Sequence, residues 1–146
     1  MPNVLELHDL VAARLRGAGQ RYTPKRRALV ETLERAGQPV SIVDLLSGRP
    51  GLPQSSAYRN LAVLEQAGVV RRVVTDEEYG RYELTEDLTE HHHHLICSNC
   101  GKVEDVTIPA TFEQSMDRTL DRLARRTGFA QVSHRLDLIG TCRDCA

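Results

Sequence analysis

The chain has 146 residues, of which 40% are hydrophobic and 27% charged, and its formal net charge is −1. This composition is typical of a globular protein, and the near-neutral charge argues against a nucleic-acid binder of the histone type. No apolar run approaches the roughly 20 residues that span a bilayer, and the first 20 residues lack the basic start and apolar middle of a signal peptide, so we expect a cytoplasmic protein without a membrane partner.

The front half of the chain predicts four helices followed by a β-hairpin. Apolar residues at helical spacing indicate a first helix over 4–17, and Thr23 and Pro24 are typical of the start of a second helix that ends before Gly37. We further expect a short helix over 42–46, a turn over 48–51, a helix from 54 or 55 to 67, and a hairpin of 69–74 and 81–84 with its loop over 76–80. This order of elements is typical of a winged helix-turn-helix domain.

The back half predicts a small α/β unit. The polar, aperiodic stretch 85–90 marks a boundary, so we expect a first domain at 1–84, a hinge at 85–90 and a second domain at 91–146. The expected elements are strands over 92–97 and 103–107, a helix from a Thr111–Gln114 capping box to about 126, a stop at Gly128, and an alternating strand over 132–140. The fold class is therefore α/β, of the α+β type.

Basic residues gather in the front half. Residues 1–84 contain 12 Lys/Arg and 10 Asp/Glu, and no acid occurs between residues 10 and 30. The apolar positions of the fourth helix predict that its N-terminal end is exposed, and such an end enters the DNA major groove in helix-turn-helix proteins. The expected DNA contacts are Arg21 in the minor groove, Ser55 and Ser56 on phosphates, Tyr58 on a thymine methyl and Arg59 on guanine, with Lys25 and Arg26 over the backbone.

The four cysteines form two CxxC pairs, Cys97 with Cys100 and Cys142 with Cys145. In a cytosolic protein such pairs indicate a metal or redox site before a structural disulfide. Two CxxC turns supply the four thiolates of a tetrahedral zinc site. Because 41 residues separate the inner cysteines, the fold must bring the C-terminus onto the first pair, and zinc would staple the second domain.

Four consecutive histidines, His91 to His94, precede the first CxxC pair. On a strand their side chains alternate between two faces, so the run can supply two separate sites. One candidate ligand set is His91, His93, Glu113 and His134. The other is Glu83, His92, His94 and Asp105, where Glu104 is an alternative that should point to the opposite face.

Several stretches of the chain resemble the ferric uptake regulator family. They are Tyr58-Arg59, Arg81-Tyr82-Glu83-Leu84, the histidine run with Leu95-Ile96-Cys97-Ser98-Asn99-Cys100-Gly101, and the ending Gly140-Thr141-Cys142-Arg143-Asp144-Cys145. The resemblance extends from about residue 10 to the end. It implies a homodimeric, metal-sensing transcription factor in which 91–146 is the dimerisation domain. Such proteins bind a palindromic operator, take no small-molecule substrate and usually repress metal-uptake or stress genes.

The resemblance also assigns roles by position. The four cysteines match the structural zinc site of the family. The set with Glu83 matches its regulatory site between the domains, and the set with Glu113 matches its third site. Arg21, Tyr58 and Arg59 match DNA-contacting positions.

The chain departs from the family pattern at the regulatory site. Iron-sensing members usually supply a histidine just before the third helix, where this chain has Gln38-Pro39-Val40, and zinc-sensing members often have a hinge cysteine that 82–90 lacks. His8 is the one front-half histidine that could substitute, although a surface position is expected for it. The helix after the second strand is longer than usual, so Asp117 is a fallback for Glu113.

Three histidines and one carboxylate in the third site resemble the zinc sensors. Intrinsic affinity also favours zinc over iron or manganese, so zinc is the expected regulatory ion. The alternatives are an iron- or manganese-responsive regulator and a peroxide-responsive regulator of the same family. A metal store or a metalloenzyme without DNA function is the alternative from another class. The enzyme is disfavoured because every cysteine is used by zinc and the sequence contains no HExxH pattern.

Overall fold

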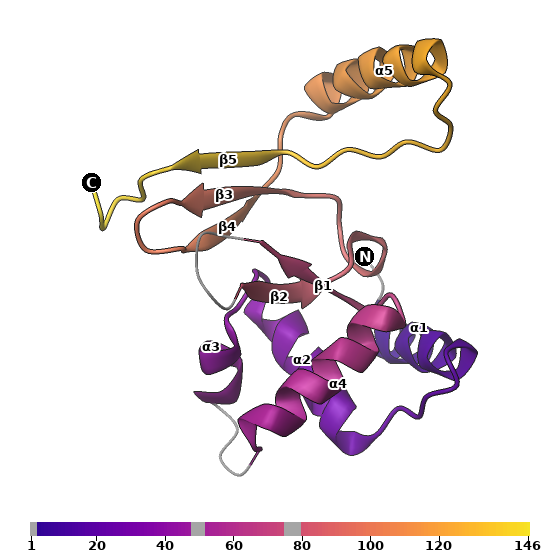
Figure 1. Ribbon diagram of the computed structural model, residues 1–146, viewed down its shortest axis with the longest axis vertical. Coiled ribbons are helices and arrows are strands. Elements are labelled where there is room, and N and C mark those ends of the chain that lie inside the picture. Colours follow the sequence, from indigo (N-terminus) through magenta and orange to yellow (C-terminus); the bar gives the residue numbers. More distant parts are fainter. Residues whose placement is uncertain (1–2, 48–51, 75–79) are drawn as a thin grey trace.

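The computed structural model describes residues 3–47, 52–74 and 80–146. The predicted turn over 48–51 and nearly all of the predicted hairpin loop lie outside these residues. The elements, shown in Figure 1, are α1 (Val4–Gly17), α2 (Pro24–Ala36), α3 (Ile42–Ser47), α4 (Gln54–Gln66), β1 (Val70–Val73), β2 (Arg81–Leu84), the 3-10 helix η1 (Glu86–Leu88), β3 (His93–Cys97), β4 (Val103–Val106), α5 (Ala110–Thr127) and β5 (Asp137–Gly140). The predicted mixed fold class is confirmed.

The helix ends follow from local hydrogen bonding. The Asn3 side chain accepts from the backbone N–H of Glu6, whose carboxylate accepts from the backbone N–H of Asn3, which makes a capping box for α1. Thr23 caps α2 in the predicted way by accepting from the backbone N–H of Arg26. Gly37 ends α2 at φ +62°, a left-handed conformation that glycine adopts without steric cost.

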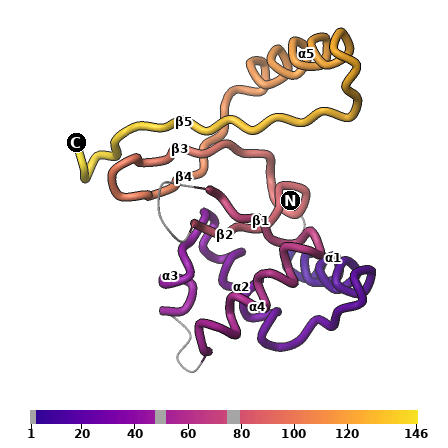
Figure 2. Tube along the Cα trace, in the orientation of Figure 1, coloured from indigo at the N-terminus to yellow at the C-terminus, as the bar shows by residue number. Residues whose placement is uncertain are grey.

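The four front helices and the hairpin share one hydrophobic core. In Figure 2 the hairpin of β1 and β2 lies between α1–α4 on one side and the back sheet on the other. The two strands are antiparallel, with Arg71 opposite Glu83, and an isolated bridge joins Val40 to Tyr82. Buried apolar side chains from every front helix meet in this core, including Leu15, Leu29, Ile42, Leu61 and Leu64.

The segment after β2 is anchored to this core. Leu88 in η1 is 2% exposed and belongs to the front core. Arg14 of α1 donates to the carbonyl oxygen of Gly68 at 2.6 Å and to the Thr85 hydroxyl at 3.3 Å, and it also pairs with Asp87. The hydrogen bond from Arg14 lowers the pKa of the Asp87 carboxyl. The first residues of the expected hinge are therefore attached to the winged helix.

The back sheet has the strand order β4-β3-β5. β3 is antiparallel to β4 and parallel to β5, and α5 forms the crossover between these two outer strands. Figures 1 and 2 show α5 projecting away from the four front helices. The central strand of the sheet therefore carries the second half of the histidine run and the first cysteine.

Two predictions for the back half are wrong in detail. The capping box is absent because α5 begins at Ala110, after Pro109, with no side-chain cap, so Thr111 already lies inside the first turn. The strand expected over 132–140 is limited to β5. Its pairing with β3 starts at His94 opposite Asp137, and residues 132–136 of the predicted strand belong to no strand.

The back half exposes many large apolar side chains. Among the described residues these are Leu95, Phe112, Leu123, Phe129, Val132, Leu138 and Ile139, of which Ile139 is 71% exposed. They lie on α5, on the segment that follows it and on the strands of the back sheet. Of the helices in the described residues, none has the length and apolar character needed to cross a membrane.

Candidate metal centres and nucleic-acid interface

The four cysteines meet at the end of the back sheet and form what we call the thiolate cluster. Cys97 ends β3, Cys100 follows in the next turn, and Cys142 and Cys145 follow β5. Their sulfur atoms lie within 4.8 Å of one another, and all four cysteines are free of disulfides. The backbone N–H groups of Cys100 and Cys142 lower the pKa of Cys97 to about 6. This favours the thiolate, which is the form that binds zinc, so the donor set fits that ion.

A second group, the hinge cluster, joins the winged helix to the back sheet. It consists of Glu83 on β2, His92 before β3, His94 on β3 and Asp105 on β4. The Glu83 carboxylate lies 3.0 Å from both His92 Nε2 and His94 Nε2. The Asp105 carboxylate lies 3.6 Å and 3.7 Å from the same two nitrogens. The Glu83 and His94 side chains are only 6% and 3% exposed.

A third group, the helix cluster, consists of His91, His93, Glu113 and His134. Glu113 lies in the first turn of α5, and one of its oxygens is 2.7 Å from Nε2 of both His91 and His134. Its other oxygen is 2.8 Å from His93 Nε2. The hydrogen bond from His93, with those from the other two histidines, lowers the pKa of Glu113 to about 2. The group therefore offers three imidazoles and one carboxylate to a cation.

The hinge and helix clusters together contain five histidines, and four of these use their two ring nitrogens in the same way. Each directs Nε2 into its cluster and Nδ1 to an outer oxygen atom. The outer partners are Glu86 for His91 (3.1 Å), the Glu90 carbonyl for His92 (2.8 Å), Asp137 for His94 (3.2 Å) and Asp117 for His134 (3.2 Å). Metal-binding histidines almost always have such an outer partner, which fixes the ring and raises its basicity. The arrangement of both clusters therefore fits a divalent ion.

Charges in the hinge cluster are strongly coupled. Burial raises the pKa of Glu83, but hydrogen bonds from His92 and His94 outweigh it and hold that pKa well below its usual range. The hydrogen bond to Glu83 in turn raises the pKa of His92 to about 9. Burial raises the pKa of Asp105. At neutral pH the metal-free cluster therefore holds a protonated His92 beside an ionised Glu83.

This protonation predicts that ion binding in the hinge cluster releases protons. To bind an ion, His92 would have to lose the proton that hydrogen bonding to Glu83 holds on it by raising its pKa to about 9, so affinity is expected to rise as the pH increases from 7 toward 9. Calorimetry in two buffers of different ionisation enthalpy measures the number of protons released. Proton release is expected to fall in His92→Ala, and an affinity that is the same at pH 7 and pH 8.5 would contradict the prediction.

The alternative ligand residues Glu104, Asp117 and His8 lie outside the three groups. Glu104 pairs with Lys102 at 2.7 Å, away from the hinge cluster, and Asp117 is an outer partner of His134. His8 is not at the surface, because it is 5% exposed and its Nδ1 lies 2.6 Å from the Tyr22 hydroxyl. The expectation of a surface histidine was wrong, since α1 turns this position toward α2 and the preceding loop.

The outer partners were not found from the sequence. Glu86 and Glu90 lie between β2 and β3, Asp137 begins β5, and Arg71, which contacts Glu83, lies on β1; nothing in their spacing shows that they approach the two clusters. The signal that could have found part of them is the high density of acidic residues on both sides of the histidine run.

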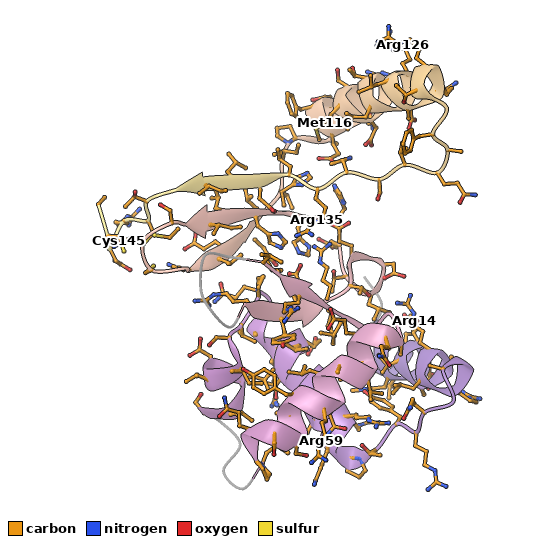
Figure 3. All side chains as sticks on the ribbon, viewed as in Figure 1. Arg14, Arg59, Met116, Arg126, Arg135 and Cys145 are labelled. Atoms are coloured by element: carbon orange, nitrogen blue, oxygen red, sulfur yellow. The ribbon has the colours of Figure 1, made fainter. Side chains whose placement is uncertain are left out.

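The expected DNA-contacting residues differ in their exposure. Ser55 and Arg59 on α4 are exposed, as is Arg21 before α2, while Ser56 and Tyr58 are half-buried. Figure 3 shows Arg59 at the end of the molecule opposite to α5, where it points outward. Tyr58 also packs against the front core, so only part of its ring is available to a ligand.

Arg26, expected over the DNA backbone, is half-buried and makes hydrogen bonds within the front half. Its Nε donates to Asn60 Oδ1 of α4 at 3.0 Å, and its Nη1 donates to the carbonyl oxygen of Arg21 at 2.7 Å. Arg26 therefore ties the loop that carries Arg21 to the exposed helix α4.

A winged helix that exposes Arg59 on α4, together with three groups of side chains that could hold metal ions, is typical of a metal-dependent DNA-binding protein. The comparison with known families identifies the particular kind. The chain belongs to the Ferric uptake regulator family, whose model matches residues 17–139. It is therefore a metal-responsive transcriptional regulator and not an enzyme, as the sequence predicted.

Individual relatives agree with this assignment. The chain is 32% identical to the peroxide operon regulator of Bacillus subtilis (strain 168) over 145 residues, which cover 95% of this chain and 94% of that protein. Its fold is similar to that of the ferric uptake regulator Fur of Helicobacter pylori, which has three functional metal binding sites (TM-score 0.76, 22% identity, 99% of this chain and 94% of that one). A zinc uptake regulator complexed with zinc and DNA also shares the fold (TM-score 0.55, 23% identity, 95% and 94% covered).

Proposed function

We propose that this chain is a cytoplasmic, homodimeric repressor that binds a palindromic operator when a divalent ion occupies the hinge cluster. The observation that carries the proposal is the composition of that cluster. Glu83 comes from the winged helix, whereas His94 and Asp105 come from the back sheet. Ligands shared between two parts of a chain restrict the angle between them, and only a narrow range of angles places two recognition helices on one operator.

The required free energy is within reach of one metal site. Shifting a dimer from 1% to 99% in the DNA-competent arrangement needs roughly 5.5 kcal/mol of differential binding. Glu83 is the residue through which this energy acts on the winged helix, because it lies on β2 directly beside the front core. We propose that residues 89–92, which follow the anchored Leu88 and overlap the end of the expected 85–90 hinge, change conformation.

The donor sets suggest different ions for different clusters. Four thiolates suit zinc, which we assign to the thiolate cluster. Two imidazoles and two carboxylates, as in the hinge cluster, suit iron(II) or manganese(II) as well as zinc. The zinc preference inferred from the sequence rests on intrinsic affinity and on the ligands of the third site. The relative named as a peroxide operon regulator suggests a peroxide response, which needs an ion that can be oxidised, and zinc(II) cannot be. We propose iron(II) or manganese(II) for the hinge cluster.

The exposed apolar face of the back half supports the homodimer. Phe112, Phe129 and Ile139 are 58%, 67% and 71% exposed, and Leu123 and Leu138 are also exposed, so the single chain leaves several large apolar side chains of the back half in water. A second copy of the chain would cover them, since a two-fold dimer buries the same surface on both subunits.

The test is binding of the dimer to operator-length DNA at buffered free concentrations of zinc, iron(II), manganese(II) and nickel(II), with bound metal measured on the same samples. One zinc per chain should remain bound throughout, while iron or manganese raises the DNA affinity. DNA binding that ignores every metal would overturn the regulatory mechanism.

A peroxide response is a second candidate, favoured by the same relative. Peroxide oxidises iron(II) readily and manganese(II) poorly. Brief exposure to hydrogen peroxide should therefore abolish DNA binding by the iron-loaded protein and leave the manganese-loaded protein active. Equal survival of both forms would exclude this candidate.

The position of Arg59 predicts a base-specific contact. Arg59→Ala is expected to weaken operator binding by about 1–3 kcal/mol and to relax base preference at one position, because a guanidinium pairs with two acceptors of guanine. Competition between the operator and single-base variants measures both effects. Arg122→Ala on α5 removes the same charge far from α4 and serves as the control, and an unchanged affinity in Arg59→Ala would refute the contact.

A further inference from the structure

A continuous set of polar contacts joins the hinge cluster to the helix cluster. Arg71 on β1 is the cross-strand partner of Glu83, and its Nε donates to Glu83 Oε1 at 2.6 Å. Its Nη2 lies 3.6 Å from Oε1 of Glu86. The other oxygen of Glu86 accepts from His91 Nδ1 at 3.1 Å, and His91 Nε2 lies 2.7 Å from Glu113. We call Arg71 and Glu86 the bridge.

The bridge is partly removed from water. The side chains of Arg71 and Glu86 are 24% and 29% exposed, and that of Glu83 is 6% exposed. Charges in such positions are screened less than surface charges, so a change at one end of the bridge is felt at the other. Both bridge residues act on ligands rather than as ligands. The Arg71 guanidinium shares Glu83 Oε1 with His94 and has no lone pair to offer an ion, whereas Glu86 contacts His91 at Nδ1, the ring nitrogen that faces away from the helix cluster.

We propose that Arg71 and Glu86 couple the two clusters, so that an ion bound in one cluster lowers the affinity of the other cluster for an ion. The proposal rests on the proposed function, since it requires both clusters to bind metal. It assigns Arg71 and Glu86 as positioning residues.

The sign follows from the charges. Glu83 cannot give its full negative charge both to Arg71 and to a divalent ion. When the hinge cluster is loaded, Arg71 is attracted less to Glu83 and more to Glu86. Glu86 paired more closely with Arg71 is a weaker acceptor for the Nδ1–H of His91, and His91 then becomes a less basic ligand in the helix cluster.

The reverse effect has the same sign. When the helix cluster is loaded, His91 Nδ1–H becomes a stronger donor and holds Glu86 more tightly. Arg71 then pairs more closely with Glu83 and neutralises more of its charge, which lowers the affinity of the hinge cluster for an ion. Coupling between two binding sites is reciprocal, and measured factors run from about 5-fold to about 150-fold. We expect about 5-fold, because both bridge residues retain some exposure.

The experiment measures cobalt(II) affinity of the full-length dimer whose thiolate cluster is loaded with zinc, in competition with a chelator of known affinity. His134→Ala disables the helix cluster and His92→Ala disables the hinge cluster, and neither residue belongs to the bridge. The affinity of each single cluster is compared with its affinity when the other cluster is already filled. The ratio of these two affinities is expected to be about 5 in the otherwise unchanged chain.

Two substitutions test the bridge itself. Glu86→Gln and Arg71→Gln are each expected to reduce the ratio to about 1. Glu90→Gln is the matched control, because this exposed residue contacts His92 through its backbone carbonyl and the substitution removes the same charge from the same segment. The ratio should stay near 5 in this control. Circular dichroism and the zinc content verify that each variant is folded.

The outcomes separate the bridge from the function it rests on. The proposed coupling is wrong if two cobalt ions bind independently in the unchanged chain, or if the affinity ratio stays near 5 in both bridge variants. Either result would leave the two metal sites as proposed. A chain that binds no cobalt beyond its zinc overturns the proposed function as well.

Discussion

Cys97→Ser is expected to unfold the back half of the protein and to abolish its dimerisation. Cys97 ends the central strand β3, and its sulfur lies in the thiolate cluster with the residues that follow β5. Structural zinc sites of this type contribute roughly 10–16 kcal/mol of apparent binding free energy, whereas whole domains are stable by about 5–15 kcal/mol. Loss of one thiolate therefore removes more stability than the small sheet can replace.

The measurements are zinc content, the size of the particle in solution, and proteolytic sensitivity. The variant should lose its zinc and become monomeric or aggregated, with rapid cleavage after residue 90 while the front core resists. Ser98→Ala, at the exposed neighbouring position, removes one hydrogen bond of 3.2 Å to the Gly140 carbonyl and should behave like the unchanged chain. A dimer of Cys97→Ser that retains one zinc per chain would show that the cluster is not a staple.

Glu83→Gln is expected to abolish metal-dependent operator binding without unfolding the protein. The amide keeps the size of the side chain but loses the charge that contacts His92, His94 and Arg71. Glu83 is the hinge-cluster member that lies on the winged helix. Without its carboxylate, an ion in the cluster would no longer be linked to the DNA-binding domain. We expect operator affinity at saturating metal to fall about 100-fold, toward that of the metal-free protein.

Glu104→Gln is the control for this experiment. Glu104 lies on β4 next to Asp105 but pairs with Lys102 at an exposed site, so the substitution removes the same charge from the other face of the sheet. Its operator affinity and metal response should be unchanged. If the operator affinity of Glu83→Gln still rises when metal is added, the hinge cluster does not regulate DNA binding.

The three groups of candidate ligands could be predicted from the sequence because most of their members are set by the spacing of neighbouring residues. Alternation along a strand separates His91 and His93 from His92 and His94, and the structure places these pairs in different clusters. The CxxC spacing likewise requires a turn, and the two turns lie side by side. The winged helix was predictable because its caps and apolar periods agree with one another, as at Thr23 and Gly37.

The rest depended on contacts between distant segments. Thr111 has the residue type and spacing of a capping box, but the N-cap is Pro109, two residues earlier. The alternating pattern over 132–136 resembles a strand, yet a strand needs a partner, and β3 pairs only from His94 onward with Asp137. His8 and Arg26 are polar residues whose burial depends on Tyr22 and Asn60, which no periodicity connects to them.

The alternation of the histidine run also limits how this stretch of sequence can evolve. One residue inserted or deleted within 91–94 would turn every later side chain of the strand to the opposite face, so each cluster would receive the other's histidines and Cys97 would leave its own group. A change of two residues would preserve the faces but shift the pairing of β3 with both neighbours. Length variation is therefore expected before residue 91 or in the turns outside the sheet, and the spacing from His91 to Cys97 should be as fixed as the residues themselves.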